Sequence, residues 1–136
     1  MRESFRVLVV DDDPGIRAYV EALGARRGWR IFVASGGEEA LDSLGEIRPD
    51  VITLDVMLPG IDGLETLRRL KEVRPDLPVI MVSGQEPWAT LDRALALGAS
   101  DFLHKPFAAE DLENAVRAAL GLQRDEDPVE KEPSQA

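Results

Sequence analysis

Short apolar runs alternate along the chain with longer segments that have helical spacing. Three runs, at residues 7–10, 51–54 and 79–82, are rich in β-branched residues and too short for a buried helix. Apart from Thr53, these runs contain no polar residue, which is typical of strands covered on both faces. Weaker strands are predicted at residues 30–34 and 101–103, so the pattern predicts five strands.

The segments between the predicted strands place apolar residues on one face of a helix. Two of them show this spacing in full: Ile16, Val20 and Leu23 in the first, and Leu64, Leu67, Leu70 and Val73 in the second. We expect Leu91, Leu95 and Leu97 to pack in the core or at its edge. A last helix is predicted from Ala109 to Leu120.

Residues that favour helix ends support these boundaries. Asp13 can cap a helix whose first residue is Pro14, and Gly28 can end it. Ser35 and Glu38 have the spacing of a capping box, which predicts the start of the second helix. These residues at the helix ends therefore agree with the hydrophobic pattern.

A strict alternation of strand and helix predicts a parallel sheet. Each crossover has to be right-handed, and the helices then cover both faces of the sheet. The fold class is therefore a doubly wound α/β fold. Ligands bind to such sheets beyond the carboxyl ends of the strands, so the residues at those ends are the candidates for function.

Composition adds limits on the domain organisation and the partners. The chain has 136 residues, enough for one domain, and 26 acidic against 16 basic residues give a net charge of −10. This charge repels phosphate backbones and anionic lipids, so direct binding to nucleic acid is not expected. We expect a globular domain at residues 1–121 and an acidic, disordered tail or linker start at residues 122–136.

The absence of cysteine and of long apolar stretches points to a soluble protein. Without cysteine, disulfides, thiolate zinc sites and a cysteine nucleophile are excluded. No stretch approaches the ~20 apolar residues of a membrane span, and the N-terminal apolar run is too short for a signal peptide. We therefore expect a cytoplasmic protein with no membrane segment.

Acidic residues gather where the predicted strands end. Asp11 and Asp12 follow the first strand and Asp55 follows the third. Three carboxylates so close together repel one another unless a cation neutralises them. Oxygen ligands without histidine or cysteine suit Mg²⁺, so the sequence predicts a magnesium site.

Two further strand ends supply groups for phosphoryl chemistry. Ser83 ends the fourth strand and offers a hydroxyl, and Lys105 follows the fifth and offers a fixed positive charge. With Mg²⁺, these groups can neutralise the oxygens of a phosphoryl group in transfer. Asp55 stands alone at the end of an apolar strand and is the candidate nucleophile, while Asp11 and Asp12 are better placed as metal ligands.

Four separated motifs together resemble the receiver domain of two-component response regulators. They are Val-Val-Asp-Asp-Asp-Pro at 9–14, Leu-Asp-Val-Met-Leu-Pro-Gly-Ile-Asp-Gly at 54–63, Val-Ser-Gly at 82–84 and Gly-Ala-Ser-Asp-Phe-Leu-His-Lys-Pro-Phe at 98–107. The resemblance covers residues 5–121. It implies the flavodoxin-like strand order 2-1-3-4-5.

The resemblance also implies a role for each matching residue. Asp55 resembles the phosphoacceptor and Lys105 the family's lysine, whose bond to Pro106 is typically cis. Asp12 resembles the direct Mg²⁺ ligand, and Asp11 would act mainly through water. The remaining assignments are a metal-binding backbone carbonyl at Met57, the switch hydroxyl at Ser83 and the aromatic switch residue at Phe102.

The sequence departs from the family pattern at two places away from the chemistry. Phe102 lacks the hydroxyl of the common tyrosine, so packing alone must decide its rotamer. Ala108 stands where the last helix would often have a capping side chain, which weakens that cap by ~1 kcal/mol.

The partners implied are those of a signalling switch. A sensor histidine kinase or a phosphotransfer protein would supply the phosphoryl group. An output domain or partner protein would respond through the fourth helix, the fifth strand and the fifth helix, and a phosphorylation-dependent dimer is compatible with this arrangement. The chain would catalyse only its own phosphoryl transfer and autodephosphorylation.

Three alternatives compete with this interpretation. An aspartate-nucleophile phosphohydrolase typically has a second acid two residues after the nucleophile, where this chain has Met57. A phosphorylation-independent interaction module would be expected to lack Asp12, Asp55 or Lys105, and all three are present. The chain is also compatible with the receiver fragment of a longer transcription regulator.

The remaining candidate side chains have simpler interpretations. His104, the single histidine, is expected to be exposed or to take part in packing, because metal binding needs partners that it lacks. Trp29 is expected to be a hydrophobic residue at the start of a strand. Trp88 is expected to open the fourth helix, where it is also a candidate for a partner contact.

Overall fold

The computed structural model describes residues 4–122, in which five strands alternate with five helices. In chain order they are β1 (Arg6–Val10), α1 (Pro14–Arg27), β2 (Arg30–Ala34), α2 (Gly37–Ile47), β3 (Val51–Asp55), α3 (Gly63–Val73), β4 (Val79–Ser83), α4 (Trp88–Ala96), β5 (Asp101–His104) and α5 (Ala109–Ala119). Apart from residue 122, the predicted acidic tail lies outside the described residues. None of the helices in this part of the chain combines the length and hydropathy that a bilayer crossing requires.

The strands form one parallel sheet in the order β2-β1-β3-β4-β5, which confirms the expected fold. Every residue of the central strands β3 and β4 is buried, as their apolar runs predict. The edge strand β2 is only partly buried, which explains its weaker signal in the sequence. The carboxyl ends of β1, β3, β4 and β5 therefore meet along one edge of the sheet.

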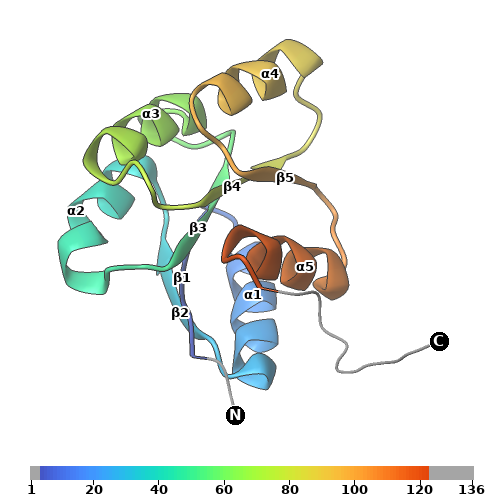
Figure 1. The fold of residues 1–136 in the computed structure, drawn as a ribbon. Helices are drawn as coiled ribbons and strands as arrows, with labels where there is room; N and C mark the ends of the chain where they lie inside the picture. Colours follow the sequence, from blue (N-terminus) through green and yellow to red (C-terminus); the bar gives the residue numbers. More distant parts are fainter. Residues whose placement is uncertain (1–3, 123–136) are drawn as a thin grey trace.

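Side chains that alternate along each strand build two separate cores. Leu8 and Val10 of β1 pack with the helices α2, α3 and α4, whereas Val7 and Val9 pack with α1 and α5. Figure 1 shows the same division, with α1 and α5 on one side of the sheet and the other three helices opposite. The strands are covered on both faces, which is why their sequences lack alternation.

The ends of α1 confirm the predicted signals. The Asp13 carboxylate accepts a hydrogen bond of 2.8 Å from the Gly15 amide, and Pro14 occupies the first turn. Gly28 ends the helix with φ = 82°, a left-handed conformation that favours glycine. Trp88 opens α4 as expected, and Trp29 is buried beside β2.

The predicted capping box at the start of α2 is wrong. The helix is capped by Gly36, one residue later than expected, and no side chain caps it. The carboxylate of Glu39 accepts hydrogen bonds from both the amide and the hydroxyl of Ser35, at 2.9 and 3.0 Å. Because the helix starts at Gly37, Glu39 and not Glu38 occupies the third helical position and reaches back to the preceding turn.

Two of the apolar residues predicted to pack are exposed. Val73 is 62% exposed because positions that step by three rotate around a helix, so the fourth member has left the buried face. Leu95 of α4 is 52% exposed, while Leu91 is buried. The α4 helix therefore offers an apolar side chain to its surroundings.

The start of α5 has a side-chain hydrogen bond that the alanine at position 108 does not predict. Ala108 has no side-chain acceptor, but the Asp111 carboxylate accepts a hydrogen bond of 3.1 Å from the Ala108 amide. The carboxylate of this partial capping box also lies in the first turn, where the helix dipole favours negative charge.

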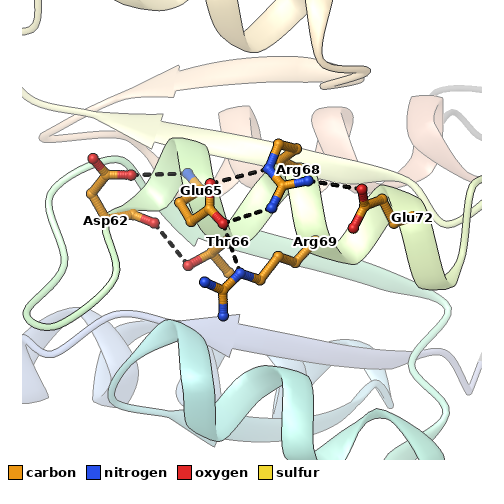
Figure 2. A network of polar contacts seen from close by, with 6 residues as sticks. All are labelled: Asp62, Glu65, Thr66, Arg68, Arg69 and Glu72. Carbon is orange, nitrogen blue, oxygen red and sulfur yellow. Dashed lines mark hydrogen bonds and ion pairs between the residues drawn. The ribbon is translucent and has the colours of Figure 1, made fainter.

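Four side chains along the exposed surface of α3 form what we call the α3 charge network: Glu65, Arg68, Arg69 and Glu72. Both arginines pair with Glu65, and Arg68 also reaches Glu72 at 2.8 Å (Figure 2). Asp62 caps the same helix by accepting a hydrogen bond from the Glu65 amide at 2.9 Å. Each charge in this network has a partner of opposite sign.

Candidate functional site

Asp11, Asp55 and Lys105 meet at the carboxyl edge of the sheet. Asp55 is the last residue of β3, Asp11 follows β1 and Lys105 follows β5. The three positions have the same alternation as the strand residues that face α1 and α5, namely Val9, Val51 and Leu103. The topology thus brings together residues that are up to 94 positions apart, as the sequence predicts.

The start of α3 holds the backbone of Asp55 in place. The Gly63 amide donates a hydrogen bond of 3.0 Å to the Val56 carbonyl. A Cβ at Gly63 would collide with the carbonyl oxygen of Asp55 and would lie 2.7 Å from Cα of Val56. Helix and strand end can approach this closely only because residue 63 has no side chain.

Asp11, Asp12 and Asp55 form what we call the acid cluster, because one oxygen from each lies within 4.8 Å of the others. Asp11 and Asp55 are buried, with 2% and 5% exposure, while Asp12 is exposed. Backbone amides fix one oxygen of each buried carboxylate: Asp13 donates to Asp11 Oδ1 at 2.9 Å, and Met57 donates to Asp55 Oδ1 at 3.0 Å.

Lys105 pairs with both buried carboxylates. Its Nζ donates a hydrogen bond of 3.0 Å to Asp55 Oδ2 and lies 3.1 Å from Asp11 Oδ2. Burial disfavours the charged amine, but the hydrogen bond to Asp55 and the negative charges of Asp55 and Asp11 outweigh this effect and raise the pKa of Lys105. The amine therefore remains a positive charge at the site.

Burial and the neighbouring charge of Asp55 raise the pKa of Asp11, although the Asp13 amide and Lys105 act in the opposite direction. The ion pair with Lys105 also lacks hydrogen-bond geometry, so Asp11 Oδ2 has no hydrogen-bond partner in residues 4–122. A buried oxygen in this state is poorly satisfied by the protein alone.

These features fit a divalent cation. The acid cluster brings three carboxylates together against a single ammonium group, which leaves an excess of negative charge. Hard oxygen ligands, an unsatisfied buried oxygen and an exposed third carboxylate are the donor set that suits Mg²⁺, which keeps several of its waters. Asp13, predicted to be a helix cap, is not in the cluster.

Met57 follows Asp55 at the rim of the site. Its amide donates a hydrogen bond to Asp55 Oδ1, and the residue is 68% exposed. The predicted metal contact is through the backbone carbonyl. That assignment remains a prediction.

The two predicted switch residues lie on neighbouring strands. Ser83 ends β4 and is fully buried, and Phe102 lies in β5, partly buried against the core on the α2, α3 and α4 side. The register pairs Ser83 with His104 and Met81 with Phe102. The bond between Lys105 and Pro106 is cis in the structure.

Two contacts at the end of β4 were not predicted from the sequence. The Ser83 hydroxyl lies 3.4 Å from Nδ1 of His104, a residue expected only to be exposed or to pack. The Gly84 amide donates a hydrogen bond of 2.7 Å to a carboxylate oxygen of Glu86. A register between β4 and β5, drawn from the expected strand ends, is the signal that could have paired Ser83 with His104.

Comparison with known proteins decides the family. Residues 7–117 match the family model of the response regulator receiver domain. The chain belongs to this family. The receiver is 39% identical over 127 residues to response regulator MprA of Mycobacterium bovis, covering 93% of this chain and 55% of that protein. It is 40% identical over 115 residues to MprA of Mycolicibacterium vanbaalenii, covering 85% of this chain and 50% of that protein.

Solved receivers have the same fold. The receiver domain of NtrX from Brucella abortus matches with a TM-score of 0.80 and 35% identity over 86% of this chain and 99% of that chain. A CheY-like receiver domain protein from Methanospirillum hungatei matches with a TM-score of 0.83 and 26% identity, covering 88% and 95%. The receiver described here spans about half the length of the MprA proteins that it matches.

Proposed function

We propose that this receiver accepts a phosphoryl group on Asp55 and passes the resulting change of state to an output partner. The observation that carries the proposal is the position of Lys105 Nζ, 3.0 Å from Asp55 and 3.1 Å from Asp11, beside an acid cluster with excess negative charge. A sensor histidine kinase or a phosphotransfer protein is the proposed donor.

In the proposed reaction, a carboxylate oxygen of Asp55 attacks the phosphorus of a phosphohistidine. A bond forms between that oxygen and phosphorus, the bond from phosphorus to the imidazole nitrogen breaks, and an acyl phosphate results. Lys105 neutralises the charge on the phosphoryl oxygens, and the Met57 amide orients the carboxylate through its hydrogen bond to Oδ1. Hydrolysis of the acyl phosphate returns the receiver to its starting state.

We propose that Asp11, Asp12 and Asp55 hold Mg²⁺, with the carbonyl of Met57 as a further ligand. Asp12, the exposed carboxylate, is the proposed direct ligand, and Asp11 acts mainly through water. When bound, the ion neutralises the carboxylates and the negative charge of the incoming phosphoryl group. Lys105 alone leaves part of that charge uncompensated.

The proposed response involves Ser83 and Phe102. The Ser83 hydroxyl turns to the phosphoryl oxygen, and the ring of Phe102 moves into the space that this releases. Phe102 lines a groove of about 510 Å³ along β5 and α5, and α4 exposes Trp88 and Leu95. This face of α4, β5 and α5 is the proposed contact with an output domain or partner protein.

A phosphorylation-independent interaction module is the competing function. Such a module would not need Lys105 to pair with both buried carboxylates. The repulsion between Asp11 and Asp55 would also serve no purpose in a module that is not phosphorylated. The arrangement therefore favours the phosphorylated switch.

Acetyl phosphate, a small phosphodonor, tests the proposed chemistry. Incubation with Mg²⁺ is expected to add one phosphoryl group to the wild type and none to Asp55→Asn, as measured by intact mass. Asp42→Asn, which removes an exposed acid of α2, is the matched control and is expected to react like the wild type. An adduct that persists in Asp55→Asn would contradict the assignment.

Hydrogen exchange tests the proposed response. Beryllofluoride, a phosphoryl mimic, is expected to change amide exchange in residues 88–120 as well as in the loop after Asp55, because the two switch residues connect these regions. Changes confined to that loop would mean that the signal does not reach the proposed output face.

A further inference from the structure

The Ser83 hydroxyl is held by a residue outside the described phosphoryl site. Ser83 and His104 are direct partners in the register of β4 and β5, and Ser83 Oγ lies 3.4 Å from His104 Nδ1. Ser83 has no exposed surface, and its hydroxyl makes no other hydrogen bond within residues 4–122. This one long bond therefore sets where the hydroxyl points.

The direction of the bond follows from the needs of the buried hydroxyl. A hydroxyl proton without an acceptor is costly when buried, and His104 Nδ1 is the acceptor within reach. A neutral imidazole accepts at Nδ1 when its proton is on Nε2, and His104 is exposed, so water can satisfy that second nitrogen. Ser83 accordingly donates and the ring accepts.

The sheet places this pair away from the acid cluster. Ser83 and His104 share the alternation of Met81 and Phe102, which face α2, α3 and α4. Asp55 and Lys105 share the alternation of residues that face α1 and α5. In the resting receiver, the Ser83 hydroxyl thus lies on the opposite side of the sheet from the carboxylate of Asp55.

We propose that His104 is a positioning residue that holds the Ser83 hydroxyl in the resting receiver and releases it when Asp55 carries a phosphoryl group. The release of the hydroxyl rests on the proposed function, whereas its hydrogen bond to His104 in the resting receiver, which we call the hold, rests on the observed contact. The bond opposes the switch, so its removal favours the phosphorylated conformation. Its length, 3.4 Å, makes it weak enough to be exchanged for a bond to a charged phosphoryl oxygen.

The hold can be observed without any phosphoryl chemistry. The chain contains a single histidine, so its imidazole nitrogen signals in NMR need no assignment. In the neutral ring we expect the Nε2–H tautomer, with an Nδ1 shift typical of an accepted hydrogen bond. Ser83→Ala is expected to move the Nδ1 shift towards that of a free ring, and a spectrum unchanged by Ser83→Ala would overturn the hold.

The release is tested with beryllofluoride, titrated in the presence of Mg²⁺. His104→Phe keeps a planar ring and removes the acceptor, so it is expected to bind beryllofluoride about two- to tenfold more tightly than the wild type. His104→Asn places an acceptor oxygen near the position of Nδ1 and is expected to behave like the wild type. When Ser83→Ala is also present, His104→Phe is expected to leave the affinity for beryllofluoride unchanged.

Each result is decisive. Equal affinity of the wild type and His104→Phe, or an effect that persists in the Ser83→Ala background, would overturn the role of His104 while leaving the proposed function intact. A wild type that binds neither beryllofluoride nor a phosphoryl group would overturn the proposed function and the release with it. The hold would then still be judged by the imidazole spectrum.

Discussion

The acid cluster and the α3 charge network differ in how their charges are balanced and in how far they are exposed. In the α3 charge network, two carboxylates meet two guanidinium groups, and all four side chains are between 35% and 64% exposed. In the acid cluster, three carboxylates meet the single amine of Lys105, and two of the three are almost fully buried. One region is balanced and exposed to water, and the other has excess negative charge with two of its three carboxylates buried.

The difference separates charges that solubilise a helix from charges that perform a task. Exposed pairs on one helix contribute little to stability, because water and salt screen them. Buried like charges destabilise the fold unless something neutralises them, so a site that retains them is expected to have a use for them. Charge that is left unpaired is thus a better guide to function here than charge that is paired.

The largest effect is expected when the acid cluster loses its exposed ligand. Asp12→Ala should weaken Mg²⁺ binding about tenfold or more, because it removes a proposed direct ligand. Asp13→Ala, the matched control, removes an adjacent acid that caps α1 and is expected to change the affinity far less. Isothermal titration with Mg²⁺ measures the affinity of both variants. Equal losses of affinity would contradict the assignment of Asp12, rather than Asp13, as a metal ligand.

A smaller and opposite effect is expected on stability. Asp11→Asn should raise the free energy of unfolding by about 1 kcal/mol in EDTA, because a neutral amide removes a buried like charge and still accepts from the Asp13 amide. Urea unfolding provides the measurement. A variant less stable than the wild type would mean that the pair with Lys105 outweighs the repulsion from Asp55.

The pH dependence of that difference has a definite sign. The pKa of Asp11 is raised above its ordinary value of 3.8, so its contribution to stability is complete below 3.8 and is lost as pH rises through the raised value. The advantage of Asp11→Asn should therefore be largest at neutral pH and shrink on acidification. An advantage that is constant between neutral pH and 3.8 would contradict the raised pKa.

The smallest effect is expected in the α3 charge network. Glu65→Gln should lower stability by less than Asp11→Asn raises it, and added salt should reduce the change further. Hydrogen bonds from Arg68 and Arg69 lower the pKa of Glu65 to about 2 from 4.5. Its contribution is present above 4.5 and is lost as pH falls towards 2, so the two variants approach the wild type from opposite sides on acidification.

The sequence predicted the sheet, its layers and the strand-end residues because these depend on local patterns. Buried strands without alternation, and acids directly after them, leave signals within a few residues of the chain. The start of α2 was misplaced by one residue because Ser35 and Glu38 have the spacing of a capping box, whereas in the structure Glu39 reaches back to Ser35. Local signals therefore identify an element more securely than its first residue.

Two contacts at the end of β4 were not predicted from the sequence. The bond between Ser83 and His104 depends on which residues of β4 and β5 lie side by side, and a shift by one residue would turn His104 to the other face. The bond from Gly84 to Glu86 depends on the path of a loop. In both cases the residue types were visible, but the geometry that gives them a role was not.

The close approach at Gly63 has a consequence for how mutations in the two regions would be tolerated. Residue 63 begins the helix that bears the α3 charge network, yet it presses on the backbone of Asp55 with no space for a methyl group. A position without any functional group is therefore as restricted as the carboxylate that it supports, while the charged residues one turn further along can vary freely. Sequence drift on α3 is thus limited at its first residue and on its buried face, and relaxed on its exposed, charged face.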